Sequence, residues 1–200
     1  DKHREILKKY VKDTKFLPTL AIIQVGDDPA STAYISQKKI FGKSIGAKVM
    51  HVKFPKNVSF EEIEEKIKNF NQDDNVHGII VQLPLPKSLD KQEVINLINP
   101  IKDVDGLTEK NANALQEGEP VFIPATARGV KTLLDAYKIE IKGKKVAIIG
   151  RSALVGRPTA QLMEKEGAKV TICHRETEDI PSKTRDADIL IVAAGHPNLV

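Results

Sequence analysis

The chain has 200 residues, of which 40% are hydrophobic and 29% are charged, so one large domain or two small ones can bury a core. This apolar content excludes a disordered chain, and the single cysteine excludes an intramolecular disulfide or a thiolate metal cluster. The net charge of +4 is scattered and aromatic residues make up only 4%, so we expect no nucleic-acid partner, and with one cysteine we expect no metal site. No apolar run approaches the roughly 20 residues of a membrane span, which predicts a cytoplasmic protein without a membrane partner.

The two ends of the sequence indicate a truncated chain. The chain begins at Asp1 without a methionine, inside an amphipathic helical pattern, and it stops shortly after the strand-like run 189–194. A parallel sheet that ended at this run would leave one edge unpaired. We therefore expect a piece of a longer chain that is incomplete at its C-terminus.

In the first half of the sequence, strand-like runs alternate with helical patterns. A Gly-Asp-Asp-Pro turn signal at 26–29 follows the first run, and Ser31 can cap the helix after it. Ser59 and Glu62 have the spacing of a capping box, and Asp90 can begin a further helix. The strands expected here cover residues 20–25, 49–54 and 76–83, and the helices 31–46, 59–70 and 90–98.

The second half begins with a segment, 99–126, that is rich in Pro, Gly, Asn and Asp and has only short apolar stretches. Beyond it the alternation resumes, with a helix near 127–137 and another from Gly156, where Pro158 suits the first turn. Strand–helix alternation predicts an α/β fold of two lobes, the second a Rossmann-like parallel sheet with helices on both faces. We place the domain boundary between residues 125 and 126. The strands expected in the second lobe cover residues 146–150, 170–173 and 189–194.

A glycine loop, Gly150 to Gly156, joins a strand to a helix, where the backbone can approach a phosphate and the first helical amides attract anions. Its spacing differs from the usual dinucleotide fingerprint, so a tight structural turn is the alternative. An NAD site usually carries an acid at the end of the next strand, but here that place reads Cys173-His174-Arg175. Arg175 and Arg151 can bind a 2′-phosphate instead, which favours NADP. Cys173 itself, inside a buried strand, is expected to be a core residue.

Three further patterns in the first half suggest a ligand site. Tyr34 and Lys38 lie four residues apart on an expected helix, so they share a face that can hold a substrate and move a proton, or that is simply solvated. Gln82 follows the third strand, where α/β sheets bind ligands, and its amide suits a heterocycle. Asp103 and Asp105 stand in a turn that is more often only a surface turn.

Five motifs occur together and in order along the chain. They are Gln24-Val25-Gly26-Asp27-Asp28-Pro29-Ala30-Ser31, Ser31-x-x-Tyr34-Ile35-x-x-Lys38, Val81-Gln82-Leu83-Pro84-Leu85, Lys102-Asp103-Val104-Asp105-Gly106 and Gly150-Arg151-Ser152-x-x-Val155-Gly156-x-Pro158. As a set they resemble the bifunctional methylenetetrahydrofolate dehydrogenase/methenyltetrahydrofolate cyclohydrolase family over essentially the whole chain. The resemblance implies oxidation of 5,10-methylenetetrahydrofolate with NADP, hydrolysis of the methenyl product to 10-formyltetrahydrofolate, and a homodimer.

The resemblance also implies roles in folate chemistry. Lys38 is then the catalytic lysine, and Tyr34 packs against the folate and helps to place Lys38. Gln82 contacts Lys38 and tunes its charge, and Asp105 holds the pterin ring by hydrogen bonds. Folate contacts are implied for the whole set Tyr34, Lys38, Val81, Gln82, Leu83 and Asp105.

For the cofactor, the resemblance implies that Gly150, Arg151 and Ser152 cradle the NADP phosphates, with Arg175 on the 2′-phosphate side. Residues 1–125 are then a folate-binding catalytic domain and residues 126–200 an NADP-binding domain. The family pattern Pro-Cys-Thr-Pro reads Pro-Ala-Thr-Ala at 124–127, and the family's C-terminal glycine- and proline-rich segment does not occur in these residues. A dehydrogenase that has lost the cyclohydrolase step and a non-catalytic NADP-binding module are the alternative functions.

Overall fold

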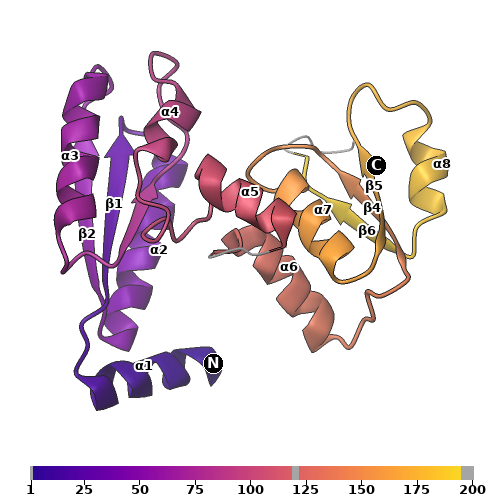
Figure 1. The fold of residues 1–200 in the computed structure, drawn as a ribbon, viewed down its shortest axis with the longest axis horizontal. Coiled ribbons are helices and arrows are strands. Elements are labelled where there is room, and N and C mark those ends of the chain that lie inside the picture. The colour runs from indigo at the N-terminus through magenta and orange to yellow at the C-terminus, as the bar shows by residue number, and fades with distance from the viewer. Residues whose placement is uncertain (1, 119–121, 195–200) are drawn as a thin grey trace. The chain divides into compact units, whose positions relative to one another are not determined.

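The computed structural model describes residues 2–118 and 122–194, and the chain divides into two compact units between Val104 and Asp105. Each unit contains a three-stranded parallel sheet with helices packed around it (Figure 1), as the α/β alternation predicted. No helix in the described ranges is both long enough and apolar enough to cross a membrane.

The first unit begins with a helix and then alternates strands with helices. Its elements are α1 (Lys2–Thr14), β1 (Thr19–Val25), α2 (Pro29–Ile45), β2 (Lys48–Phe54), α3 (Phe60–Gln72), β3 (Gly78–Val81) and α4 (Lys91–Asn96). The strand order is β2-β1-β3, with Ile22 of β1 level with His51 on one side and Ile80 on the other. Right-handed crossovers place α2 and α3 on opposite faces of this sheet, so the central strand β1 is almost wholly buried.

Caps fix where the first unit's helices begin. Ser31 was expected to cap α2, but the cap is Asp28, whose carboxylate accepts the Ser31 amide at 2.7 Å. Ser31 instead lies inside the first turn, where its hydroxyl donates to the Leu83 carbonyl at 3.1 Å. The capping box of Ser59 and Glu62 is confirmed at the start of α3. The helix that Asp90 caps ends at Asn96, two residues earlier than expected.

The second unit repeats the same strand topology. Its elements are α5 (Glu109–Glu117), α6 (Ala125–Ala136), β4 (Lys145–Ile149), α7 (Gly156–Lys165), β5 (Lys169–Cys173), α8 (Ile180–Arg185) and β6 (Ile189–Val192). The strand order is β5-β4-β6, again with the first strand in the centre. α6 and α7 pack against Val146 and Ile148 on one face, while α8 lies on the other side of the sheet (Figure 1). Cys173 is fully buried, as predicted for a core residue.

The second unit differs from the expectations at two places. Segment 99–126, for which no helix was predicted, contains α5, because Thr108 caps the first turn of this helix and Gly118 ends it with a φ of 88°. The run 189–194 was expected to be a buried strand, but β6 alternates, and Leu190 and Val192 are 42% and 52% exposed. Only one face of β6 packs against the core, because the short helix α8 buries none of its own residues.

Candidate functional site

Lys38 and Gln82 meet at the carboxyl edge of the first sheet, although 44 residues separate them in the sequence. Lys38 Nζ donates a hydrogen bond to Gln82 Oε1 at 2.9 Å. The Gln82 backbone amide donates to the Ile23 carbonyl at 2.8 Å, and Gln82 Nε2 donates to the Leu83 carbonyl at 3.1 Å. Because the amide nitrogen donates to a carbonyl, the amide oxygen is fixed facing Lys38 Nζ. The contact that the family resemblance implied is therefore present and well oriented.

Tyr34 lies one helical turn before Lys38 on α2 and is 65% exposed. An exposed aromatic residue one turn from Lys38 offers a stacking surface for a planar ligand. Leu83 is half-buried, and its carbonyl accepts hydrogen bonds from both Ser31 and Gln82. Val81 is only 4% exposed, so its side chain is not available to a ligand.

A second hydrogen-bonded chain of side chains starts at Lys39, the residue after Lys38, and no local pattern predicted it. Lys39 Nζ is 3.0 Å from His51 Nδ1, and His51 Nε2 is 3.0 Å from Gln24 Oε1. Gln24 Nε2 then donates to the Gly26 carbonyl and to Thr32 Oγ1, both at 3.2 Å. Every donor in this chain finds an acceptor only if His51 is neutral, with its proton on Nε2.

The environment of His51 favours that neutral form. Burial, followed by the nearby ammonium groups of Lys39 and Lys53, holds the pKa of His51 below its ordinary value of 6.5. The chain ties α2 to the sheet at Thr32 and at Lys39, on either side of the segment that carries Tyr34 and Lys38. Lys38 therefore projects from a helical segment, residues 32–39, that is hydrogen-bonded to the sheet at both ends.

Lys102 anchors the segment that leads to the two aspartates. Its Nζ donates to three carbonyls at the end of α3, those of Phe70, Asn71 and Asp73, at 3.0, 2.9 and 2.8 Å. A cation at a helix C-terminus also complements the helix dipole. Asp103 pairs with Ile79 as an extra bridge to the first sheet and is 1% exposed, whereas Asp105 is only half-buried. Of the two carboxylates, Asp105 is the one with surface available to a ligand.

The glycine loop of the second unit is built by close backbone approach. Gly150 has a φ of 117°, and a Cβ on Gly156 would lie 2.0 Å from the Gly150 carbonyl oxygen. Ser152 Oγ accepts the amides of Val155 at 3.2 Å and Gly156 at 3.4 Å. Its own O–H remains available to donate, so an exposed hydroxyl beside the loop backbone fits a phosphate oxygen.

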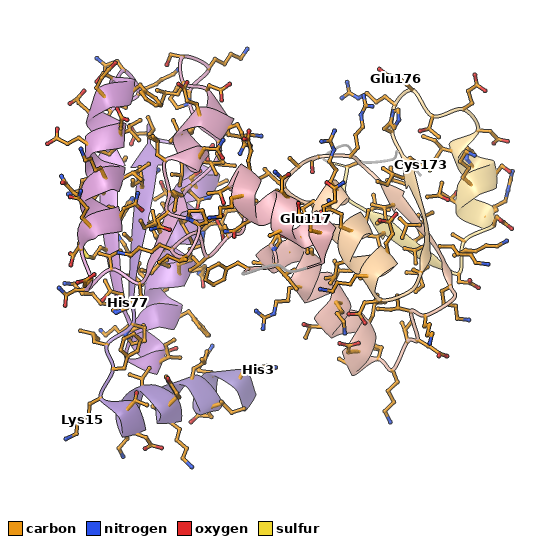
Figure 2. The ribbon with its side chains drawn as sticks, viewed as in Figure 1. His3, Lys15, His77, Glu117, Cys173 and Glu176 are labelled. Carbon is orange, nitrogen blue, oxygen red and sulfur yellow. The ribbon has the colours of Figure 1, made fainter. Side chains whose placement is uncertain are left out.

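Arg151 and Arg175 are both exposed, on the loop after β4 and just after β5. The Gly150 amide donates to the Cys173 carbonyl at 2.8 Å, which holds the two segments together. An acid that the pattern at 173–175 did not include lies one residue further on, at Glu176, which Figure 2 labels. Its Oε2 is 3.3 Å from Arg151 Nη2. No group of three His, Cys, Asp or Glu side chains within residues 2–118 and 122–194 is placed to hold a metal ion.

The fold and these sites define a protein of two α/β units, one with a lysine–glutamine pair at its sheet edge and the other with a glycine turn of nucleotide-binding type. Residues 1–105 match the family model described as tetrahydrofolate dehydrogenase/cyclohydrolase, catalytic domain. Residues 124–200 match the NAD(P)-binding domain of the same family. The chain therefore belongs to the tetrahydrofolate dehydrogenase/cyclohydrolase family.

Individual relatives agree with this assignment. The bifunctional protein FolD of Clostridium tetani is 44% identical over 184 residues, which cover 92% of this chain and 66% of that protein. The crystal structure of the bifunctional FolD enzyme of Campylobacter jejuni superposes with a TM-score of 0.96 at 41% identity, over 100% of this chain and 72% of that one. The FolD of Trypanosoma brucei, described as complexed with NADP cofactor and inhibitor, gives a TM-score of 0.92 at 34% identity, over 98% and 69%. This chain thus spans about two thirds of the length of such relatives.

Proposed function

We propose that this chain is the major part of an enzyme that oxidises 5,10-methylenetetrahydrofolate with NADP and hydrolyses the methenyl product to 10-formyltetrahydrofolate. The observation that carries the proposal is the hydrogen bond of 2.9 Å between Lys38 and Gln82. These are the two residues to which the family resemblance assigns the chemistry. The bifunctional relatives support both activities, and we propose that the enzyme acts as a cytoplasmic homodimer.

In the hydrolysis, water adds to the methenyl carbon and gives one proton to Lys38 in its amine form. The bond between this carbon and N5 then breaks, N5 takes up the proton of the new hydroxyl group, and the formyl group stays on N10. Gln82 suits this task because its amide oxygen accepts a hydrogen bond from the lysine nitrogen and so fixes the position of that nitrogen. Tyr34 covers a face of the folate ring system, and the half-buried Asp105 accepts hydrogen bonds from the pterin.

NADP supplies the hydride acceptor when bound. On the protein side, the task is to position the cofactor and to match its charge. The backbone at Gly150 and the hydroxyl of Ser152 would hold the linking phosphates, and Arg151 and Arg175 would hold the 2′-phosphate. In this proposal residues 1–125 bind the folate and carry its chemistry, and residues 126–200 bind NADP.

The decisive variant is Lys38→Ala in the full-length protein, assayed by the absorbance of methenyltetrahydrofolate and of NADPH. We expect cyclohydrolase activity to fall at least ~100-fold, since a positioned general base contributes about that much or more, while NADP binding stays unchanged. Lys43→Ala, an exposed lysine on the same helix, is the matched control and retains activity. Hydrolysis by Lys38→Ala at the wild-type rate would contradict the assignment. A wild-type enzyme that oxidises but does not hydrolyse would identify a dehydrogenase alone.

Two further measurements test the remaining parts of the proposal. Asp105→Asn should weaken folate use far more than Asp103→Asn, and equal effects would mean that the whole turn is structural.

Sedimentation of the full-length protein at micromolar concentration should show a dimer, and a purely monomeric protein would contradict the proposed assembly.

A further inference from the structure

The turn after β5 places a carboxylate on the arginine that the proposed cofactor site needs. Glu176 Oε2 lies 3.3 Å from Arg151 Nη2 and 3.7 Å from His174 Nδ1. The turn itself is closed by three bonds among its own residues. The His174 amide donates to Thr177 Oγ1 at 2.9 Å, the Thr177 amide donates to the His174 carbonyl at 2.9 Å, and the Glu176 amide donates to His174 Nδ1 at 3.3 Å. Glu176 is therefore held beside the glycine loop by the conformation of its own backbone.

The ion pair is weak enough to be exchanged. The side chain of Arg151 is 54% exposed and that of Glu176 is 75% exposed, so water and salt screen the attraction between them. A phosphate monoester carries close to two negative charges and three acceptor oxygens, and it competes for the same guanidinium group. A 2′-phosphate can thus displace Glu176, but the displacement leaves the carboxylate close to the phosphate with its partner lost.

From this geometry we infer that Glu176 is a specificity-determining residue that lowers the preference for NADP over NAD. This inference rests on the proposed NADP site. The carboxylate competes with the 2′-phosphate of NADP for Arg151, whereas the ribose hydroxyl of NAD leaves the Arg151–Glu176 pair intact. NAD therefore binds without breaking this pair, and NADP binds at the cost of breaking it. With the arginines alone the site would strongly prefer NADP over NAD, and Glu176 reduces that preference.

The test is equilibrium binding, by titration calorimetry, of NADP, NAD and the probes 2′,5′-ADP and 5′-AMP to the full-length protein. We expect Glu176→Gln to tighten NADP and 2′,5′-ADP binding about fivefold, with NAD and 5′-AMP changed less than about twofold, because only the first two carry the 2′-phosphate. Glu178→Gln removes the same charge two residues further along the chain, from another exposed side chain, and should change every affinity less than about twofold.

A second arm tests whether Glu176 acts through Arg151. In an Arg151→Ala background, Glu176→Gln should no longer tighten 2′,5′-ADP binding. The inference is overturned if Glu176→Gln leaves NADP binding unchanged or weakens it, if Glu178→Gln has the same effect, or if the gain persists without Arg151. A wild-type protein that binds neither NADP nor 2′,5′-ADP would instead overturn the proposed cofactor site itself. The two failures are therefore distinguishable from the wild-type titration alone.

Discussion

The two units share one strand topology but organise the carboxyl edges of their sheets in different ways. In the first unit the edge carries long polar side chains locked in hydrogen bonds, and Gln24 within that layer is only 1% exposed. In the second unit the edge consists of glycine backbone in close contact, flanked by exposed arginine side chains. The first arrangement suits a group that must hold or move a proton at a fixed point. The second arrangement suits the binding of a large anion by backbone amides and exposed arginine side chains.

This difference predicts different weak points. The first edge should fail when a hydrogen-bonding side chain is removed, because its partners remain buried and unpaired. The second should fail when the backbone is crowded, and it should respond only moderately when an exposed charge is removed.

Gly156→Ala should have the largest effect on stability. The added Cβ would lie 2.0 Å from the Gly150 oxygen and 2.7 Å from its carbonyl carbon, so the backbone must move. We expect the unfolding free energy of the second unit, measured by denaturant titration, to fall by about 3 kcal/mol. We also expect the variant to lose NADP binding. Gly129→Ala in α6 is the control, since its Cβ meets nothing within 4 Å and alanine favours the helix by about 1 kcal/mol. Equal stability of the two variants would show that the loop is not crowded.

Lys102→Met should be the most damaging side-chain change in the first unit outside the Lys38–Gln82 pair. It removes the ammonium group that satisfies three carbonyls at the end of α3 while keeping much of the apolar stem. We expect a loss of roughly 2–3 kcal/mol in the first unit, with NADP binding unaffected. Lys68→Met, an exposed residue of α3, should change the unfolding free energy by less than about 0.5 kcal/mol. If both variants unfold at the same denaturant concentration, the Lys102 contacts do not stabilise the fold.

Arg175→Ala should weaken NADP binding by about tenfold and leave NAD binding nearly unchanged, because the lost contact is to the 2′-phosphate. Titration of both cofactors measures the change directly, with the exposed Arg185→Ala as the control. Equal weakening of both cofactors, or a wild-type preference for NAD, would contradict the cofactor assignment.

The smallest effect is expected from the titration of His51. Its pKa is lowered in the folded protein from an unfolded value of 6.5, so the fold favours the neutral ring. This contribution to stability is complete above the unfolded pKa and is lost as the pH falls through that value toward the folded pKa. His51→Gln should therefore reduce the drop in unfolding free energy between about pH 7.5 and pH 5.5. An identical pH dependence in the wild type and in His51→Gln would show that the ring is not coupled to folding.

Local signals were sufficient for most of the fold. The alternation of strands and helices, the capping box at Ser59 and the helix start near Gly156 were predicted because each depends on residues within one or two turns. The helix α5 was missed because its nine residues carry little apolar pattern, and only Thr108 and Gly118 marked its ends. Ser31 and Asp28 can both cap a helix. The neighbouring Leu83 carbonyl engages Ser31 and leaves the cap to Asp28.

The sequence by itself determined the motifs, their order and hence the family, because those depend only on residue types and spacing. It also identified Lys38, Gln82 and the loop from Gly150 as candidate site residues. Only the tertiary structure decided what surrounds them. The His51–Gln24 chain, the three carbonyls on Lys102 and the carboxylate on Arg151 join residues 25 to 32 positions apart. Such contacts are set by strand register and turn geometry, which align distant segments in ways that no local pattern encodes.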